Sequence, residues 1–401
     1  MRLGQAVVKE GKALIHLYDL DQALTGGLLE PARLNVFYNP YMTLNRDISV
    51  LILRAYIDDV APHSPVNIVE PMTATGVRAV RYALEAGEGV GEVIASDISE
   101  KAVSIASVNV KINNVDDKVK VVRREARSLM YELRWENPKP ILYVDIDPFG
   151  TPAPYILAAL SLVGHRGLLG VTATDLAVLE GSKPKASKRR YLVYNIEKIP
   201  SSKEVGVRIL IGFIARMAAM LDKSVKPVLA YSHRHYARVF LIVERGSRRS
   251  DKMLEDNIGC IKFSAQTGYS LMLRWDECLE AQRTIGPLWV GNLFNRDLLN
   301  TVLRLAENEY SYMDTINDII NMIRLILEEE PLQYYIHQRI DALASKARTS
   351  MPRRDLLLQY IRDKGYSASR THFSPVGFRT DAPMNQVLEI LRLLGQRHFS
   401  K

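Results

Sequence analysis

Apolar, β-branched runs alternate with helical stretches from residue 67 to residue 174, and this alternation limits the fold more than any other feature. Each run is short enough to be a buried strand. Strands that alternate with helices form a parallel sheet with helices on both faces. The predicted strands are Asn67–Glu70, Glu92–Asp97, Val119–Val122, Pro140–Val144 and Leu168–Thr174, and Val228–Tyr231 with Ala237–Val243 predicts a hairpin beside them.

The fourth strand runs into the sequence Asp145-Ile146-Asp147-Pro148-Phe149-Gly150. Ligands of open α/β sheets bind outside the carboxyl ends of the strands. There an aromatic ring can stack on a nucleotide base, and a carboxylate can accept a hydrogen bond from an exocyclic amine. The alternative is a strand that ends in a Pro-Gly turn beside one solvated Asp.

The first strand ends at Glu70 and is followed by a small-residue loop, Pro71 to Gly76, and a predicted helix, Val77–Glu85. This pattern resembles the cofactor loop of class I methyltransferases. A glycine lets the backbone approach a ligand, and the helix N-terminus offers N–H groups. Arg78 and Arg81 share a helix face, so either could reach the carboxylate of a methionine moiety.

An acidic residue, Asp97, ends the second strand about twenty residues after Gly76, the spacing at which a carboxylate binds ribose hydroxyls. NAD enzymes share this spacing, but the chain lacks their G-x-G-x-x-G fingerprint. Glu125 and Ala126 follow the third strand, where an acid commonly faces adenine in methyltransferases. The alternative for Glu125 is a solvated position among neighbouring arginines.

The composition points to an intracellular enzyme with a polyanionic partner. The chain has 401 residues and a formal net charge of +8. No apolar run is long enough to span a bilayer, and the N-terminus shows no secretory signal, so we expect a cytoplasmic location. Cys260 and Cys278 are too few and too far apart for a disulfide framework or a four-thiolate zinc site. His233 and His235 lie on a predicted strand without a third ligand nearby, so we predict no metal site.

The pattern changes after Gly246-Ser247-Arg248-Arg249-Ser250, which we interpret as a domain boundary. A domain of residues 1–246 would begin with a β-rich lead-in, and residues 247–401 would form a smaller α+β domain. A long amphipathic helix is predicted over Glu204–Leu221. In the second domain, predicted helices cover roughly 296–307, 312–329, 333–346 and Asn385–Leu394.

Several motifs together resemble one family, the tRNA guanine-26 N2-dimethyltransferases, in particular the archaeal form. The resemblance covers nearly the whole chain and implies a class I S-adenosylmethionine-dependent (Rossmann-like) domain followed by a smaller α+β domain. The family transfers methyl groups from S-adenosylmethionine to the exocyclic amine of guanosine 26 in tRNA, usually twice. The motifs are Phe37-Tyr38-Asn39-Pro40 with Asn45-Arg46-Asp47, Ala74-Thr75-Gly76-Val77-Arg78, Asp145-Ile146-Asp147-Pro148-Phe149-Gly150, Gly170-Val171-Thr172-Ala173-Thr174-Asp175, Gly286-Pro287-Leu288-Trp289-Val290-Gly291 and Arg370-Thr371-His372-Phe373-Ser374-Pro375.

The resemblance implies a role for each matching residue. Asp147 would hold the target amine and Phe149 would pack on the guanine, so both are candidate catalytic residues. Phe37 and Pro148 would border the same pocket. The implied cofactor-binding residues are Arg46, Thr75, Gly76, Arg78, Asp97, Ile98, Glu125 and Ala126.

The sequence departs from the family at three places. Glu125 stands where the family usually has Asp, which puts the adenine contact in doubt. Relatives tend to have Gly and Pro after the residue that matches Asp175, so the loop Thr174–Gly181 is expected to have another shape. Some relatives carry cysteine clusters that bind zinc, and because Cys260 and Cys278 stand alone we predict no structural zinc.

The expected partner is tRNA, with no membrane, no protein partner and a monomeric state. An amino-methyltransferase acting on another nucleic acid or on protein would usually carry Asn/Asp-Pro-Pro-aromatic, whereas this chain has Asp-Pro-Phe-Gly. A non-catalytic RNA-binding protein would carry a degraded cofactor loop. Candidate phosphate contacts are Lys183, Lys185, Lys188, Arg189, Arg190, Arg245, Arg248, Arg249, Arg348, Arg353 and Arg354.

Overall fold

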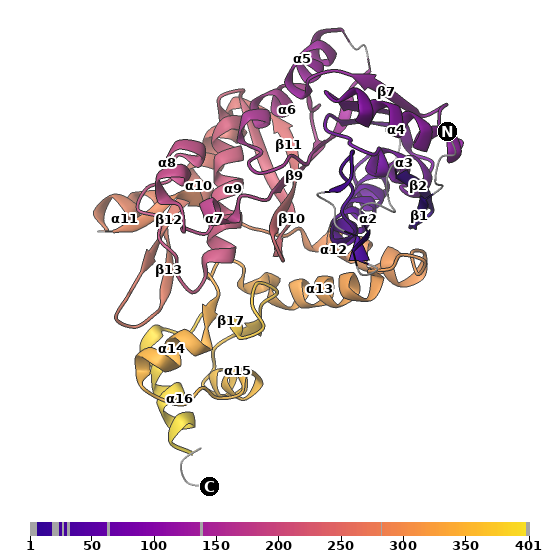
Figure 1. The fold of residues 1–401 in the computed structure, drawn as a ribbon. Helices are drawn as coiled ribbons and strands as arrows, with labels where there is room; N and C mark the ends of the chain where they lie inside the picture. The colour runs from indigo at the N-terminus through magenta and orange to yellow at the C-terminus, as the bar shows by residue number, and fades with distance from the viewer. Residues whose placement is uncertain are drawn as a thin grey trace. The chain divides into compact units, whose positions relative to one another are not determined.

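The computed structural model describes residues 6–17, 24–25, 28–29, 33–61, 65–136, 139–281 and 283–397. Seven strands form one sheet in the order β10-β11-β9-β8-β5-β6-β7 (Figure 1). The pairs β5–β6, β5–β8, β6–β7 and β8–β9 are all parallel. β10 (Lys223–His233) and β11 (Tyr236–Arg245) are joined by the turn Arg234–His235. This is the class I methyltransferase strand order that the sequence predicts.

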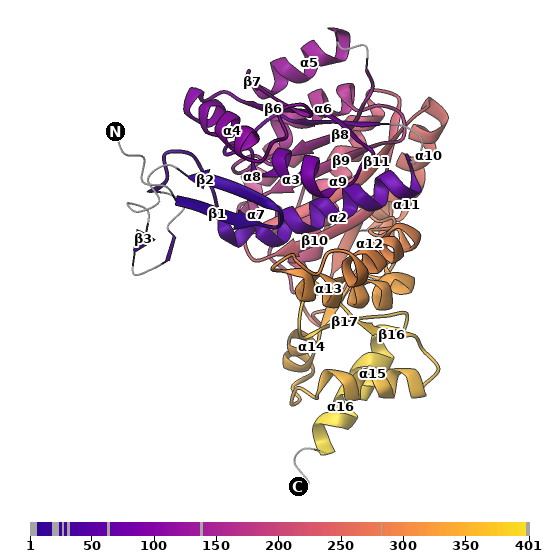
Figure 2. The ribbon, with the colours of Figure 1, turned by 90° about the vertical axis from the view of Figure 1, so that its right-hand side faces the viewer.

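Backbone contacts divide the chain into two compact units, and the first comprises Met1–Thr172, Phe240–Arg245 and Asp297–Asn321. Its helices pack against a sheet whose inner strand β5 is buried along its whole length. Figure 2 shows the β1–β2 hairpin of this unit. Its elements are β1 (Ala6–Glu10), β2 (Ala13–Leu17), β3 (Leu24–Thr25), β4 (Leu28–Leu29), η2 (Pro40–Met42), α2 (Thr43–Asp59), β5 (Val66–Glu70), α3 (Val77–Glu85), β6 (Val90–Asp97), α4 (Glu100–Ile112), β7 (Val119–Arg123), α5 (Ala126–Glu136), β8 (Ile141–Ile146), η3 (Ala153–Tyr155), α6 (Ile156–Leu162), most of β9 (Gly167–Ala173) and α12 (Arg296–Asn308).

The second unit comprises Ala173–Val239, Gly246–Arg296 and Met322–Lys401. Near its C-terminus, α14, α15, α16 and β17 enclose a core of aliphatic residues around Phe378. Further elements of the unit are α7 (Leu176–Leu179), α8 (Pro184–Tyr191), α9 (Ser202–Ala219), α10 (Ser247–Asn257), β12 (Ile258–Phe263), β13 (Ser270–Arg274), α11 (Trp275–Glu280), β14 (Thr284–Trp289), η4 (Glu330–Leu332), β15 (Gln338–Arg339), α14 (Ile340–Ala347), α15 (Arg354–Asp363), β16 (Ala368–Arg370), β17 (Gly377–Thr380) and α16 (Met384–Arg397), and α13 (Ile316–Glu329) begins in the first unit and ends in the second.

Most predicted elements form where the sequence places them, because local signals start and stop them. Helix α3 spans Val77–Glu85 as predicted, directly after Gly76. Ser99 caps α4, since its hydroxyl accepts a hydrogen bond from the Ala102 N–H at 3.4 Å. Among the described helices, none is both long enough and apolar enough to cross a membrane.

Some predicted segments differ in the structure. Ser247 starts α10, so the stretch interpreted as a boundary is the first turn of a helix. The predicted boundary after residue 246 stays a proposal. The predicted helix at 333–346 is shorter and begins at Ile340, because β15 pairs with β17 just before it.

Helix α9 is buried along most of its length rather than amphipathic, because β10, β14, α7 and α10 all pack against it. His235 lies in the β10–β11 turn and not on a strand.

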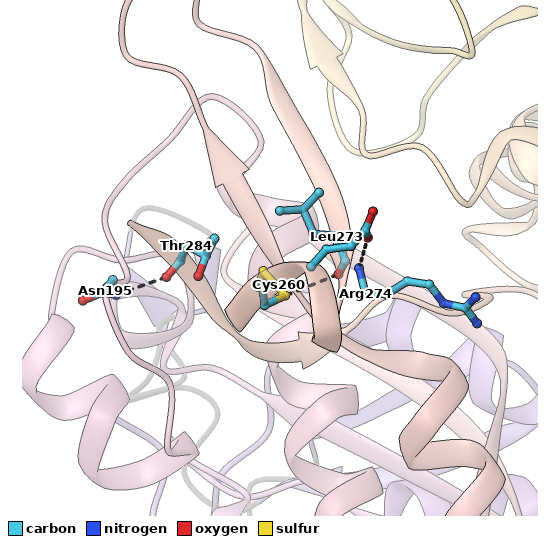
Figure 3. The surroundings of a disulfide bond; sticks show 7 residues. Asn195, Cys260, Leu273, Arg274 and Thr284 are labelled. Atoms are coloured by element: carbon cyan, nitrogen blue, oxygen red, sulfur yellow. Dashed lines mark hydrogen bonds between the residues drawn. A yellow bond between two sulfur atoms is a disulfide. The ribbon is translucent and has the colours of Figure 1, made fainter. Parts of the chain in front are cut away.

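The expectation that the two cysteines stay apart is wrong. Cys260 in β12 and Cys278 in α11 form a disulfide bond with their Cα atoms 6.0 Å apart (Figure 3). β12 pairs with β13 in an antiparallel hairpin, and α11 follows β13 directly, so the chain returns to Cys260 within 18 residues. The bond therefore links a sheet strand to the short helix beside it.

Removal of this disulfide is expected to lower the free energy of unfolding by about 3 kcal/mol, because a closed loop of this size restricts the unfolded chain. The measurement is denaturant unfolding of the wild type and of Cys260→Ala/Cys278→Ala, each with and without a thiol reductant. Reductant should weaken the wild type to the level of the double variant and leave the variant unchanged. A wild-type protein that is equally stable in reductant would contradict the prediction.

Candidate active site

The carboxyl ends of β5, β6 and β8 meet at one edge of the sheet. β5 lies between β6 and β8, and all of these pairs are parallel. The sheet therefore brings together the loop that ends at Gly76, the turn at Asp97 and the corner at Asp147. All of these lie in the first unit, and this edge is where open α/β sheets bind their ligands.

Asp147 is held by the guanidinium of Arg78 at this edge. The Arg78 Nε atom donates to Asp147 Oδ2 at 3.0 Å, and Arg78 Nη2 donates to the same oxygen. No bond to Asp147 Oδ1 is present within the described part of the chain. One oxygen of the carboxylate is thus occupied, and the other stays open to a ligand.

Arg78 is itself fixed by buried groups around it. Its Nη2 donates to Asn45 Oδ1 at 3.0 Å, and its Nη1 donates to Ser49 Oγ at 3.2 Å and lies 3.8 Å from Asp145 Oδ2. Burial alone would lower the pKa of Arg78, but the charges of Asp147 and Asp145 raise it well above its usual value. Arg78 is therefore a fixed cation behind Asp147.

Two aromatic rings meet close to this corner. Phe149 is 75% exposed, and its ring meets that of Phe37 edge to face, with 4.5 Å between the centroids. Pro148, which lies between Asp147 and Phe149 in the sequence, is buried. Gly150 has a φ of +77°, which turns the chain away after Phe149. The predicted neighbours Phe37, Asp147 and Phe149 thus lie near one another.

The loop before α3 has the features that a bound cofactor requires. Gly76 has a φ of +77°, and a Cβ at this position would lie 3.1 Å from the Ala106 Cβ, so only glycine fits. The Thr75 hydroxyl is buried and has no hydrogen-bond partner among the described residues. Asp97 accepts hydrogen bonds from the backbone N–H groups of Ala74 at 3.0 Å and Ser99 at 2.9 Å, which ties the loop to the end of β6. These residues fit a nucleoside-containing cofactor.

The adenine side of the predicted cofactor site is open. Ile98 is 67% exposed, whereas Ala126 is buried. Glu125 caps α5 by accepting from the Ser128 N–H at 3.0 Å, and it pairs with Arg127 Nε at 3.0 Å. Partial burial tends to raise the pKa of Glu125, but these hydrogen bonds lower it overall. The Glu125 carboxylate therefore already binds groups at the start of α5.

Arg46, one of the implied cofactor-binding residues, is already engaged by a carboxylate of the chain itself. It lies on α2 and pairs with Glu10 of β1 through two bonds of 2.6 and 2.5 Å. Arg81 also reaches Glu10, at 2.9 Å, so the predicted alternative to Arg78 is occupied elsewhere. Burial would raise the pKa of Glu10, but Arg46 and Arg81 lower it to about 2.

The Glu10 contacts predict that stability falls in acid. Because the pKa of Glu10 falls from 4.5 to about 2 on folding, the unfolded chain binds more protons between these values. Unfolding should become easier as pH falls from about 4.5 to about 2, by about 3 kcal/mol for this group. Chemical unfolding at several pH values should show a shallower pH dependence for Glu10→Gln than for the wild type. Glu88→Gln, at an exposed position, is the control, and equal slopes for all three proteins would contradict the expectation.

Sequence reasoning missed the residues that act behind the predicted site. Asn45 was quoted in a motif without a role, and Asp145 was seen only as a second carboxylate. Asp145 is buried and accepts a hydrogen bond from the Tyr82 hydroxyl. Burial raises the pKa of Glu70, at the end of β5, to about 8. The available signal was that Asn45, Asp145 and Glu70 are polar residues within or at the end of apolar runs.

The predicted loop after Asp175 lies in the second unit. Asp175 accepts from the Tyr191 hydroxyl at 2.8 Å and from Arg190 Nη1 at 3.0 Å, and α7 follows it in the loop predicted to differ from relatives. No cluster of potential metal ligands occurs in the part of the chain that the structure describes.

Comparison with known proteins gives a consistent result. Residues 15–392 match the family described as "TRM: N2,N2-dimethylguanosine tRNA methyltransferase". A protein named tRNA (guanine(26)-N(2))-dimethyltransferase from Aeropyrum pernix is 40% identical over 405 aligned residues, which cover 98% of each chain. One of the same name from Saccharolobus solfataricus is 34% identical and covers 96% of this chain and 98% of its own.

A solved structure agrees over nearly the same length. It is described as Trm1 from Pyrococcus horikoshii in complex with S-adenosyl-L-methionine, and it superposes with a TM-score of 0.83 at 32% identity. The match covers 96% of this chain and 100% of that one. The chain therefore belongs to the N2,N2-dimethylguanosine tRNA methyltransferase family.

Proposed function

We propose that this protein transfers methyl groups from S-adenosylmethionine to the exocyclic N2 of guanosine 26 in tRNA. The observation that carries the proposal is the Asp147 carboxylate, which Arg78 holds by one oxygen beside the exposed Phe149 ring. The relatives from Aeropyrum pernix and Saccharolobus solfataricus bear the name of this activity. Two successive transfers are part of the proposal.

The predicted cofactor-binding residues are proposed again, except that Arg78 is assigned to Asp147, Asn45 and Ser49 rather than to the cofactor. Thr75, Gly76 and Asp97 would hold the nucleoside, and Ile98, Glu125 and Ala126 would surround its adenine. Arg46 keeps its Nη1 atom without a hydrogen bond among the described residues, so it can still donate while it holds Glu10. When bound, S-adenosylmethionine supplies a methyl group on a sulfonium that is already activated for transfer.

The chain's own residues must make a poor nucleophile react. The lone pair of a guanine amine is delocalised into the ring, so the main task is positioning. We propose that Asp147 Oδ1 accepts a hydrogen bond from one amine N–H, which favours a pyramidal nitrogen and draws off positive charge as the methyl arrives. Arg78 keeps the carboxylate oriented through two N–H groups that donate to one oxygen. A second transfer uses the N–H that remains after the first.

The target base must leave the stacked tRNA to reach this corner. Extrusion of a base costs a few kcal/mol, and stacking against an aromatic ring offsets part of that cost. Phe149, with Phe37 at its edge, offers that ring. The other contacts would come from basic side chains binding phosphates. A monomeric state and a cytoplasmic location stay predictions.

The test uses labelled S-adenosylmethionine and unmodified tRNA transcripts that carry guanosine or adenosine at position 26. We expect label in the guanosine transcript, recovered as N2-methylated nucleoside, and none in the adenosine transcript. Label that survives the substitution would move the target to another nucleotide. No transfer to either transcript by a protein that still binds the cofactor would contradict the proposal.

A further inference from the structure

Helix α5 exposes aromatic and basic side chains on one face. Trp135 is 80% exposed and Tyr131 is 41% exposed. Arg127, Tyr131 and Trp135 follow each other at intervals of four residues, so they lie along one face, and Arg134 is three residues after Tyr131. We call Arg127, Tyr131, Arg134 and Trp135 the α5 face.

The fold does not account for these exposed rings. Helix α5 buries Ala126, Leu129 and Met130, and it packs against α6 on that side (Figures 1 and 2). By helical spacing Tyr131 and Trp135 lie on the face opposite these buried residues, and most of the Trp135 ring is exposed. Large aromatic side chains contribute most when they are buried, so a ring as exposed as that of Trp135 suggests a surface that becomes covered on binding.

The charges beside the rings suit a polyanion. The guanidinium carbon of Arg134 lies 5.2 Å from the centre of the Trp135 ring, and Arg134 has no ion pair within the described residues. Arg127 pairs with Glu125 at 3.0 Å and Arg124 pairs with Glu132 at 3.3 Å. Exposed ion pairs of this kind contribute little, so a phosphate can replace the carboxylate in them.

We propose that the α5 face is a docking surface for the tRNA substrate, away from the target base. An unpaired nucleotide stacks on Trp135, and the phosphates beside it pair with Arg134 and Arg127. This inference rests on the proposed function, because that function supplies tRNA as the partner. Aromatic rings interleaved with arginines are what proteins use to bind single-stranded nucleotides, and the chain's net charge of +8 favours the same partner.

The first test compares Trp135→Ala with a matched variant, Trp275→Ala. Trp275 is also an exposed tryptophan, at 44%, but lies on α11 of the second unit. Loss of one stacking contact is expected to weaken binding of an unmodified tRNA transcript about tenfold in Trp135→Ala. KM for tRNA should rise by a similar factor, kcat at saturating tRNA should stay unchanged, and Trp275→Ala should match the wild type.

A second readout does not depend on removing the ring. The chain has three tryptophans, and Trp289 is buried, so Trp275→Phe leaves Trp135 as the exposed fluorophore. Bound tRNA should quench its emission and protect it from a soluble quencher. Arg134→Ala should lower the slope of log affinity against log salt by about one, because one phosphate contact is lost.

The outcomes separate this inference from the proposed function. If the wild type methylates guanosine 26 but Trp135→Ala binds tRNA like the wild type, the α5 face does not bind tRNA. If Trp135→Ala changes the sedimentation mass of the free protein and leaves tRNA affinity unchanged, the face contacts a second copy, and the inference is overturned. If the wild type methylates no tRNA, the proposed function fails. Quenching of Trp135 by tRNA would then still show whether tRNA binds the α5 face.

Discussion

Replacement of Asp147 by asparagine is expected to lower kcat by about 10²- to 10⁴-fold, with little change in the binding of S-adenosylmethionine or tRNA. The reason lies in the Arg78 contact. Arg78 takes one oxygen of the side chain with two N–H groups, so the amide oxygen of asparagine would stay at Arg78. The amide NH₂ would then face the guanine amine, and a donor would stand where the reaction needs an acceptor.

Single-turnover methyl transfer measures this effect apart from binding. Asp117→Asn, at an exposed position, is the matched control and should behave as the wild type. Equilibrium binding of cofactor and of tRNA should stay within a few-fold of the wild type for both variants. Transfer by Asp147→Asn at nearly the wild-type rate would remove Asp147 from the chemistry.

The second large effect concerns stability, at a buried cluster of charges in the second unit. We call it the buried charge cluster. Arg379 donates to Glu329 Oε2 at 2.6 Å and to Glu204 Oε1 at 2.9 Å, and the side chains of both acids are fully buried. The members are Glu204, Arg208, Glu329, His337, His372 and Arg379.

Arg379→Met is expected to lower the free energy of unfolding by about 3–5 kcal/mol, because it leaves buried carboxylates without one of their cations. Burial would raise the pKa of Glu329, but His372 and Arg379 lower it to about 2, so the carboxylate is charged at neutral pH. Denaturant unfolding at neutral pH measures the loss. Arg304→Met, at an exposed arginine, is the control and should cost much less.

A double-mutant cycle separates the charge effect from lost packing. Glu329→Gln removes the carboxylate charge that Arg379 faces, so the cost of Arg379→Met should be smaller in the Glu329→Gln background than in the wild type. Additive losses would mean that the two side chains act independently. The motif around His372 and Phe373 packs against the same cluster, since the His372 ring bonds to Glu329 and Phe373 stacks on His337.

The fold and the location of the site were predictable because local signals determine them. An apolar strand, a small-residue loop and a helix follow each other from Asn67 to Glu85, and the structure has β5 and α3 there. Since parallel strands end at one edge, the sequence also placed Gly76, Asp97 and Asp147 near one another. The aromatic pair of Phe37 and Phe149 followed from the resemblance.

The ion pairs were not predictable, because they join residues far apart in the sequence. Arg46 meets Glu10 across 36 positions, and Arg78 meets Asp147 across 69. An arginine in a motif signals that an anion is near but does not say which one. The disulfide was missed for a related reason: only the antiparallel hairpin of β12 and β13 shows that the chain returns from Cys278 to Cys260.

The most direct measurement of the central claim, that Asp147 acts on the exocyclic amine of the target base, uses tRNA with inosine at position 26. Inosine differs from guanosine only by the absence of this amine. We expect no methyl transfer to the inosine tRNA, with binding close to that of the guanosine tRNA and full transfer to the latter. Methyl transfer to the inosine tRNA would show that another atom is the acceptor and would contradict the account.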